Sequence, residues 1–351
     1  MPDTIRIGIV GTGFAERVQM PGLAHVEGAR LVAVSSGHRS SAERAARAFG
    51  IPNVCDDAAE LASRDDVDLV IISSPPFTHA SATLAALAAG KHVLCEKPMA
   101  LNVGEADAMV AAADAVGVLS LIDHELRFNP TRRRARQLIA EGYVGTVRHV
   151  SAVYRANIGR RHQAFTWWYQ TSTGGGLLGA VGSHVIDTCR WWLGEIADVD
   201  CTLRTFVAER PDAASGTMRR VESDDFASLR MRSASGVTIE ASLSSVAPGP
   251  TEHRFEVVGS DGTLLLDDER LTLTGWRDDR TEDLTEPDPA RGLPGLINAL
   301  WAPSFVNLAR EIVTALRDGR TTVPGAATFR DGRAVQVVLD EARASAARRA
   351  S

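Results

Sequence analysis

A glycine-rich run near the start of the chain has residue types that can bind a diphosphate. The run, Gly11-Thr12-Gly13-Phe14-Ala15-Glu16, directly follows the apolar segment Ile5–Val10. Gly11 permits a tight turn, Gly13 allows a pyrophosphate to approach the backbone, and the following helix N-terminus offers unpaired N–H groups. The third small residue of the dinucleotide fingerprint GxGxxG is shifted here. We expect contacts to a dinucleotide from Gly11, Gly13, Phe14 and Ala15, with an ordinary strand-to-helix turn as the alternative.

A polar segment further along bears on the choice between NAD and NADP. It reads Ser35-Ser36-Gly37-His38-Arg39-Ser40 and contains no acidic residue. A carboxylate at this place binds the ribose hydroxyls of NAD and repels the 2'-phosphate of NADP. Ser36, His38 and Arg39 can instead bind that phosphate through hydroxyl and charge-assisted hydrogen bonds. The sequence therefore favours NADP over NAD, with a solvated loop charge as the alternative for Arg39.

Short apolar segments alternate with Ala-rich helical segments in the first third of the chain. We expect strands at Ile5–Val10, Leu31–Ser35, Leu69–Ile72, His92–Cys95 and Leu119–Ile122. We expect helices at Ala42–Phe49, Ala80–Ala89 and Glu105–Val116, each ending at a glycine. Apolar strands joined by helical crossovers predict a doubly wound parallel sheet with helices on both faces, the Rossmann arrangement.

The pattern changes after Ile122 to segments that alternate polar and apolar residues. Strands are expected at His149–Tyr154, Phe226–Met231, Val237–Ser242, Phe255–Gly259 and Thr263–Asp267, with turns at Ser235-Gly236, Ser260-Asp261-Gly262 and Thr274-Gly275. Helices are expected at Thr131–Glu141, Pro303–Leu316 and Arg330–Ala347, and a loop at Thr281–Leu293. The chain is thus predicted to be an α/β protein with a Rossmann domain over 1–123. A second, α+β domain follows over 124–351, and its C-terminal helices can pack back on the first.

Composition excludes several classes of partner. The chain has 351 residues, 44% hydrophobic and 23% charged, which is typical of a globular protein. Lys and Arg number 38 against 44 Asp and Glu, a net charge of -6, so nucleic acid and anionic membranes are not expected partners. There is no CxxC pair, signal-like N-terminus or apolar run of membrane-spanning length. We expect a cytoplasmic protein without disulfides.

Other catalytic chemistries find no support in the motifs. The sequence has no HExxH, P-loop or GxSxG element, and its nine histidines are scattered, so no metal is expected. The basic run Arg132-Arg133-Arg134 lies on an expected amphipathic helix. A solvated helix face explains it better than a polyanion site.

The most specific motif is Cys95-Glu96-Lys97-Pro98, which closes an expected strand. Together with the glycine-rich run and Ser74-Pro75-Pro76-Phe77-Thr78-His79, it resembles the Gfo/Idh/MocA oxidoreductase family. The resemblance extends through Arg127-Phe128-Asn129-Pro130, Gly142–Val147, Gly174-Gly175-Gly176, Gly182–Asp187 and Phe329–Gly332. It implies an NAD(P)-dependent dehydrogenase or reductase acting on a sugar-like, cyclitol or related small polyol or carbonyl. It also implies an open, mostly antiparallel sheet in the second domain, a cleft active site between the domains, and a homodimer or homotetramer.

The resemblance also implies roles for individual residues. Lys97 polarises the substrate oxygen and helps move its proton, and Glu96 orients the cofactor or pairs with Lys97. His184 donates a hydrogen bond to the same oxygen or accepts one from it. Asp187 lies three residues later on the same helix face, where it orients His184 or contacts the substrate. A structural histidine and a helix-surface acid are the alternatives for these two. Ser74, Pro75 and His79 are expected at the cofactor.

One position departs from the family pattern. Many members carry Asp four residues before the histidine, where this chain has Ala180. A catalytically weak nucleotide-binding sensor, or a redox-cycling hydrolase or lyase, therefore stands as an alternative function. Substrate contacts are expected from Arg127, Tyr154, Trp167 and Trp168, with a salt bridge for Arg127 and a core position for at least one tryptophan as the alternatives.

Overall fold

The computed structural model describes residues 3–161, 164–297 and 300–350. The chain divides into two compact units. The first unit comprises Met1–Asn129 and Asp288–Arg333, and the second comprises Pro130–Pro287 and Ala334–Ser351. The two units differ in their bounds from the domains predicted over 1–123 and 124–351, because the segments 124–129 and 288–333 belong to the first unit.

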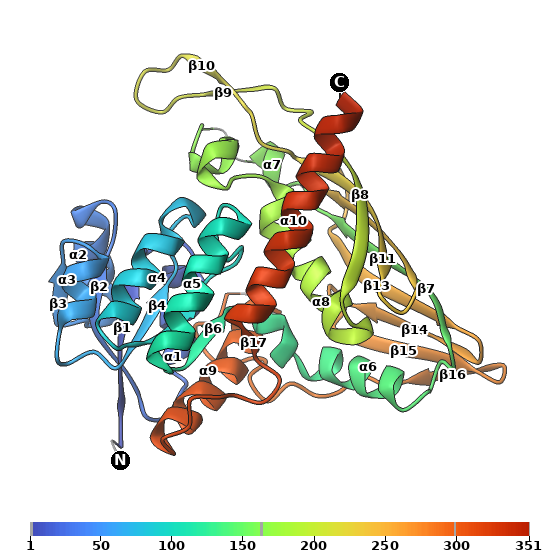
Figure 1. Ribbon diagram of the computed structural model, residues 1–351, viewed down its shortest axis with the longest axis horizontal. Coiled ribbons are helices and arrows are strands. Elements are labelled where there is room, and N and C mark those ends of the chain that lie inside the picture. Colours follow the sequence, from blue (N-terminus) through green and yellow to red (C-terminus); the bar gives the residue numbers. More distant parts are fainter. Residues whose placement is uncertain (1–2, 162–163, 298–299, 351) are drawn as a thin grey trace. The chain divides into compact units, whose positions relative to one another are not determined.

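The first unit contains a seven-stranded sheet in the order β17-β6-β5-β4-β1-β2-β3 (Figure 1). Its strands are β1 (Ile5–Val10), β2 (Ala29–Ser35), β3 (Asn53–Cys55), β4 (Leu69–Ile72), β5 (His92–Cys95), β6 (Ser120–Ile122) and β17 (Ala327–Thr328). Only the pairing of β17 with β6 is antiparallel among the strands described. The order of β3 to β6 is that of a dinucleotide-binding fold, so the predicted parallel sheet is confirmed.

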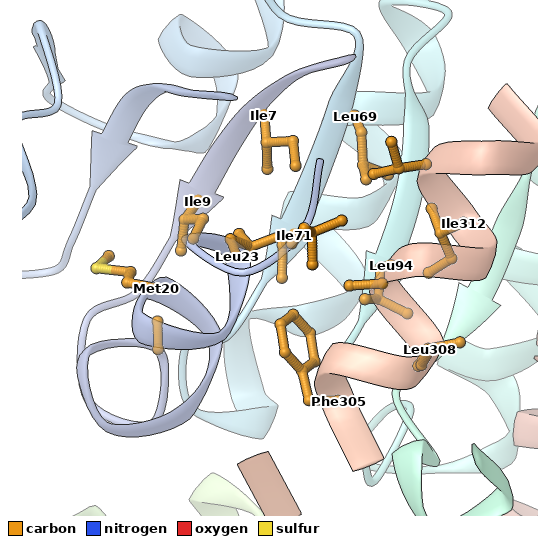
Figure 2. Packing of buried hydrophobic residues seen from close by; sticks show 14 of the residues in the cluster. Ile7, Ile9, Met20, Leu23, Leu69, Ile71, Leu94, Phe305, Leu308 and Ile312 are labelled. Atoms are coloured by element: carbon orange, nitrogen blue, oxygen red, sulfur yellow. The ribbon is translucent and has the colours of Figure 1, made fainter. Parts of the chain in front are cut away.

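Helices cover both faces of this sheet. They are α1 (Met20–Leu23), α2 (Arg39–Phe49), α3 (Ala58–Ser63), α4 (His79–Ala88), α5 (Val103–Val116) and α9 (Trp301–Arg317), with short helical turns η1 (Ala15–Gln19), η2 (Pro76–Thr78) and η3 (Glu125–Phe128). Ile7, Ile71 and Leu94 pack against α9 on one face, as Figure 2 shows. Val70 and Ile72 face α3, α4 and α5 on the other. Burial on both faces explains why the strands read as unbroken apolar runs.

The second unit is built on an eight-stranded sheet in the order β16-β15-β14-β13-β7-β12-β11-β8. Its strands are β7 (Val147–Arg155), β8 (Ile196–Arg204), β11 (Phe226–Ser233), β12 (Thr238–Ser244), β13 (Glu252–Gly259), β14 (Gly262–Asp267), β15 (Thr272–Arg277) and β16 (Arg280–Asp283), and β9 (Glu209–Pro211) pairs separately with β10 (Met218–Arg220). Among the described pairings of the eight-stranded sheet, only β7 with β12 is parallel. The predicted mostly antiparallel sheet is confirmed.

Helices cover one face of this second sheet. They include α6 (Pro130–Ala140), α8 (Ser183–Leu193) and, from residue 334 on, α10 (Phe329–Ala350); α7 (Ile158–Arg161) and the turns η4 (Trp167–Tyr169), η5 (Thr171–Thr173) and η6 (Leu178–Gly182) complete the unit. Leu229, Ile239 and Phe255 are buried in its core, whereas alternate residues such as Arg230 and Glu240 are exposed. One sheet face is therefore covered by helices of this unit and the other carries polar side chains.

The turns of the second sheet are only partly as predicted. The turn at Ser235-Gly236 forms with Gly236 at φ 91°. The turn predicted at Thr274-Gly275 is wrong, because Gly275 lies inside β15, where an added Cβ would overlap Tyr143 and Leu284. The chain instead reverses after β15 at Asp278 and Asp279, which have φ 51° and 59°. Gly275 therefore serves close packing, a second common use of glycine in a strand.

Two further expectations concern covalent links and membranes. The four cysteines are buried free thiols. In the part of the chain that the structure describes, no helix has the length and apolar character needed to cross a bilayer.

Candidate functional site

The glycine-rich run lies at the carboxyl end of β1. Gly11 has φ 98°, and a Cβ added there would lie 2.5 Å from the Ser74 backbone nitrogen. At Gly13 an added Cβ would meet no atom within 4 Å. Only glycine fits at position 11, because the backbone after β4 lies too close for a side chain. Gly13 instead borders open space that a diphosphate can approach. The residues present fit a dinucleotide phosphate group.

The next two residues of this run serve different purposes. Phe14 is partly buried, and its ring centroid lies 5.9 Å from Lys97 Nζ. Ala15 is fully buried in the core of the first unit, so only its backbone remains for a ligand. The run therefore brings an aromatic ring to Lys97 while Ala15 anchors η1.

The polar segment after β2 presents its side chains to solvent. Ser36 Oγ lies 3.4 Å from Thr12 Oγ1, which joins this segment to the glycine-rich run. His38 and Arg39 are exposed at the start of α2. The Arg39 guanidinium pairs with Asp56 and, at 3.3 Å, with Glu43. Arg39 thus forms ion pairs with two surface carboxylates, and such exposed ion pairs contribute little free energy in water.

The loop after β4 contains the other expected cofactor residues. Ser74 Oγ lies 2.6 Å from Thr78 Oγ1, and Pro75 immediately precedes η2. His79 is 1% exposed, and its ring nitrogens lie 2.8 and 2.9 Å from the carbonyl oxygens of Ser74 and Pro98. Burial lowers the pKa of His79. His79 therefore ties two loops together from inside the unit and does not present its ring to a ligand.

Lys97 lies two residues beyond the end of β5 and is partly exposed. The sequence contains only one other lysine, Lys91, whose Nζ donates to the carbonyl oxygens of Arg64 and Val67, each at 2.8 Å. Lys91 thus has a structural role, and Lys97 is the lysine at the carboxyl edge of the sheet, where ligands of this fold bind.

Behind Lys97 lies a buried group of polar side chains. Glu96, Asp123 and Gln19 are 6%, 0% and 0% exposed. Gln19 Nε2 donates to Glu96 Oε1 at 3.0 Å and to Asp123 Oδ2 at 2.8 Å. Glu96 Oε2 accepts the backbone N–H of Lys97 at 3.2 Å. The first helical turn after the glycine-rich run is thereby joined to the ends of β5 and β6.

Both carboxyls of this group are hard to ionise. Burial and the neighbouring Asp123 charge raise the pKa of Glu96 well above its usual range. Burial raises the pKa of Asp123 to about 6, opposed by the hydrogen bond from Gln19. Lys97 lowers the pKa of both carboxyls. Burial thus opposes ionisation of both carboxyls, and the charge of Lys97 favours it.

The second unit contains the remaining expected catalytic residues. His184 and Asp187 both lie on α8 and are each 2% exposed. The glycines before this helix fit closely: a Cβ at Gly176 would overlap Asp224, whose carboxylate accepts the Leu178 N–H at 2.7 Å. Ala180 lies in η6, four residues before His184, and is partly buried. The structure thus brings His184 and Asp187 together on one short helix.

A buried ion pair lies beside α8. Arg132 is 1% exposed, and its Nη2 lies 2.5 Å from Asp268 Oδ2 while Nη1 donates to Thr188 Oγ1 at 2.7 Å. Burial lowers the pKa of the adjoining His253 to about 4, so that ring stays neutral. The solvated face predicted for the run Arg132–Arg134 is wrong for Arg132, because its charge is satisfied inside the unit.

The expected substrate residues are found in several surroundings. Arg127 is 5% exposed and pairs with Asp331 at 3.3 Å, as its structural alternative anticipated. Tyr154 is buried, and its ring meets the edge of His253 at 5.5 Å. Trp167 and Trp168 are both partly exposed, with ring centroids 5.8 Å apart. The two tryptophans are therefore the more accessible members of this set.

Comparison with known proteins decides the family. Residues 5–124 match the family model described as an oxidoreductase family with an NAD-binding Rossmann fold, and residues 132–265 match the Gfo/Idh/MocA C-terminal domain. The chain belongs to the Gfo/Idh/MocA oxidoreductase family. It is therefore an NAD-binding oxidoreductase, and the resemblance seen in the sequence is confirmed.

Relatives within the Gfo/Idh/MocA family cover three quarters of this chain or more. Human glucose-fructose oxidoreductase domain-containing protein 2 is 31% identical over 97% of this chain and 90% of its own. Levoglucosan dehydrogenase of Pseudarthrobacter phenanthrenivorans is 29% identical over 76% of this chain and 75% of its own. A levoglucosan dehydrogenase structure with NADH and L-sorbose has a TM-score of 0.88 at 25% identity, covering 99% of this chain and 97% of that one.

In this Gfo/Idh/MocA protein, Gln19 and Asp123 were not identified from the sequence, and Arg132 was assigned to a solvated helix face. Gln19, Asp123 and Arg132 are all buried, and each binds a group that is distant in sequence. A polar residue within an apolar segment, such as Asp123 after Leu121-Ile122, was the available signal. Its partner Gln19 is 104 positions away, and no local pattern links the two.

Proposed function

We propose that this protein is an NAD(P)-dependent dehydrogenase that transfers a hydride between the cofactor and a sugar-like or cyclic polyol, or the corresponding carbonyl compound. The observation that carries the proposal is Lys97, partly exposed at the carboxyl end of β5 and 5.9 Å from the Phe14 ring of the glycine-rich run. Relatives named levoglucosan dehydrogenase support a sugar-like substrate.

The proposed cofactor residues lie in three loops of the first unit. Gly11, Gly13 and the N–H groups at the start of η1 would hold the diphosphate, and Ser74 and Pro75 would border it. Ala15 and His79 support these loops from within the core. The bound nicotinamide would accept or donate the hydride.

We propose a preference for NADP, through Ser36, His38 and Arg39. No carboxylate stands at residues 35–40 to repel a 2'-phosphate. The ion pairs of Arg39 with Asp56 and Glu43 are exposed, so a phosphate can displace them at little cost. The solved complexes of relatives name NADH or NAD, which makes this the sharpest question for a binding measurement.

Proton movement is assigned to Lys97 and His184. In the oxidation direction, Lys97 Nζ would take the proton of the hydroxyl whose carbon loses the hydride. His184 would donate to or accept from the same oxygen, and Asp187 would orient His184 or the substrate. Trp167 and Trp168 offer ring faces for stacking on a sugar, whereas Arg127 and Tyr154 are better placed to support the site than to touch substrate.

The first test is direct. Affinities of the full-length protein for NAD(H) and NADP(H), measured by calorimetry, should show tight binding with NADP(H) preferred. Tighter binding of NAD(H) would refute the role of Arg39, and binding of neither would overturn the proposed function.

The second test removes Lys97. Lys97→Met should lower the rate of hydride transfer to a panel of sugars and cyclitols by at least about 100-fold, the usual contribution of acid–base catalysis. Nucleotide affinity should stay within a few-fold. Lys91→Met is the matched control and should retain turnover, since Lys91 binds only backbone carbonyls in the described contacts. Equal rates for wild type and Lys97→Met would remove Lys97 from the mechanism.

Ala180 favours a second candidate, a nucleotide-binding protein of the same fold with little turnover. An alanine can neither accept a substrate hydrogen bond nor supply charge near the reacting oxygen. Tight cofactor binding without turnover across the panel would support this reading. Turnover without net reduction of the cofactor would instead indicate a redox-cycling hydrolase or lyase.

A further inference from the structure

The buried group of Gln19, Glu96 and Asp123 is more elaborate than holding Lys97 in place requires. A primary amide has two N–H donors, and Gln19 Nε2 gives one to each carboxyl, at 3.0 and 2.8 Å. The two carboxyl groups therefore meet at one nitrogen atom, and a side-chain hydrogen bond between Glu96 and Asp123 also raises the pKa of Glu96. Both residues are less than one-tenth exposed.

Two carboxyl groups that share one donor atom and are shielded from water cannot both ionise easily. Like charges in a poorly solvated site favour one shared proton, as in other carboxyl pairs of proteins. The charge around this pair supports the same state. Glu125, which is fully buried, raises the pKa of Glu96, whereas Lys97 lowers it. Further titratable groups are Cys95, whose pKa is raised by burial and by both carboxyls, His79, whose pKa is lowered by burial, and His124, which follows Asp123 in the chain.

The pair contacts the residue that we assign to proton transfer. Glu96 Oε2 accepts the Lys97 backbone N–H at 3.2 Å. Gln19 ends η1, the helical turn that begins at the glycine-rich run. A fixed orientation of Glu96 thus fixes the start of the Lys97 side chain relative to Phe14, whose ring lies 5.9 Å from Nζ.

We propose that Asp123 and Gln19 are positioning residues for Lys97: they hold Glu96 in place and make it share one proton with Asp123, so that the pair keeps a single negative charge behind the lysine. This proposal rests on the proposed function for its purpose, because a charge held constant keeps Lys97 in the same electrostatic setting while protons move at the substrate. Its physical content can be tested without cofactor or substrate.

The first measurement is infrared spectroscopy of the full-length protein at pH 8. Wild type should show the carbonyl band of a protonated carboxylic acid, which moves on ¹³C labelling of either the glutamate or the aspartate side chains. Asp123→Asn and Glu96→Gln should each lose the band, because the remaining carboxyl then ionises. Absence of the band from wild type, or its persistence in both variants, would overturn the proposal.

The second measurement uses the scarcity of lysine in this chain. Reductive ¹³C-methylation labels Lys91, Lys97 and the N-terminus, which gives few and resolvable methyl signals. Each single variant keeps one negative charge, so the Lys97 signal at pH 8 should move little. The double variant Glu96→Gln/Asp123→Asn removes the charge and should move the signal several times further than the sum of the single changes. Additive changes would mean two independent charges and would refute the shared proton.

Controls separate this charge effect from misfolding. Asp68→Asn removes a carboxylate that acts on Lys91, so it should move the Lys91 signal and leave that of Lys97 unchanged. The Lys91 signal should stay constant in the Glu96 and Asp123 variants, and the infrared band of wild type decides the matter if a variant does not fold. A shared proton in a protein that binds neither NAD(H) nor NADP(H) would refute the proposed function alone. Nucleotide binding without the shared proton would refute only this inference.

Discussion

At the scale of single residues, the carboxyl pair links the site to the stability of the first unit. The pKa of Asp123 is about 6 in the folded protein, above its ordinary value of 3.8. A raised carboxyl pKa means that the folded state holds the proton more tightly than the unfolded state. The associated stability is present below about pH 4 and is lost as the pH rises through about 6.

This sign gives a measurable difference between variants. The double variant Glu96→Gln/Asp123→Asn has no proton to lose at the pair, so its stability relative to wild type should increase between pH 4 and pH 8. The expected change is on the order of 1–3 kcal/mol in the free energy of unfolding, from urea titrations at the two pH values. A difference between the two proteins that does not vary with pH would contradict the raised pKa of the pair.

At the scale of elements, the turn between β1 and η1 separates two uses of glycine. Gly11 has φ 98°, and an added Cβ would lie 2.5 Å from the backbone of the β4 end. Gly11→Ala should therefore lower the melting temperature by several degrees as well as weaken nucleotide binding. Gly13 has open space around its Cβ position. Gly13→Ala should keep the melting temperature within a degree or two and weaken only nucleotide binding, measured by calorimetry.

The paired result is diagnostic of a phosphate cradle. If Gly13→Ala binds NAD(H) and NADP(H) as wild type does, the backbone at Gly13 does not approach the diphosphate. The cofactor would then have to enter the first unit elsewhere. If Gly11→Ala has the same melting temperature as wild type, the close approach of this turn to Ser74 is not rigid.

The predictability of these elements follows the range of the interactions that form them. The strands β1, β4 and β5 were predicted to the residue, because burial on both sheet faces makes each a mostly apolar segment. The short β3, the edge strands β8 and β16, and β15 beside β16 were missed. The segment Thr281–Leu293, predicted as a loop, begins within β16, whose four residues are all exposed. Exposed edge strands carry no hydrophobic alternation that could identify them.

The residues of the candidate site also differ in whether they could be identified from local sequence. Motif residues such as Gly11, Lys97 and His184 are local in sequence and could be named from it. The ion pair of Arg132 with Asp268 and the bridge from Gln19 to Asp123 join positions 136 and 104 residues apart. Both interactions depend on burial, and burial makes Arg132, an arginine of a basic run, an internal hydrogen-bond donor to Thr188 of α8. Only the folded chain reveals such roles.

At the scale of the whole molecule, the second sheet predicts self-association. Helices of the second unit cover one face, and the other face carries cross-strand rows of partly exposed and exposed residues. Leu265 stands opposite Glu256 in one row, and Val258 stands opposite Thr263 in the next. A broad sheet face that mixes apolar and charged side chains suits a symmetric interface, which in a stable dimer buries about 1,600 Å².

We therefore expect the protein to be a homodimer or homotetramer that associates through this face. Light scattering after size exclusion should give a multiple of the 37.5 kDa chain mass. Leu265→Arg would place an unpaired charge in this interface, so it should shift the mass toward 37.5 kDa at micromolar concentration. Ala111→Arg, on the exposed side of α5, is the matched control and should leave the mass unchanged. A wild-type mass of one chain would end the proposal, and an unchanged mass in Leu265→Arg would move the interface away from this face.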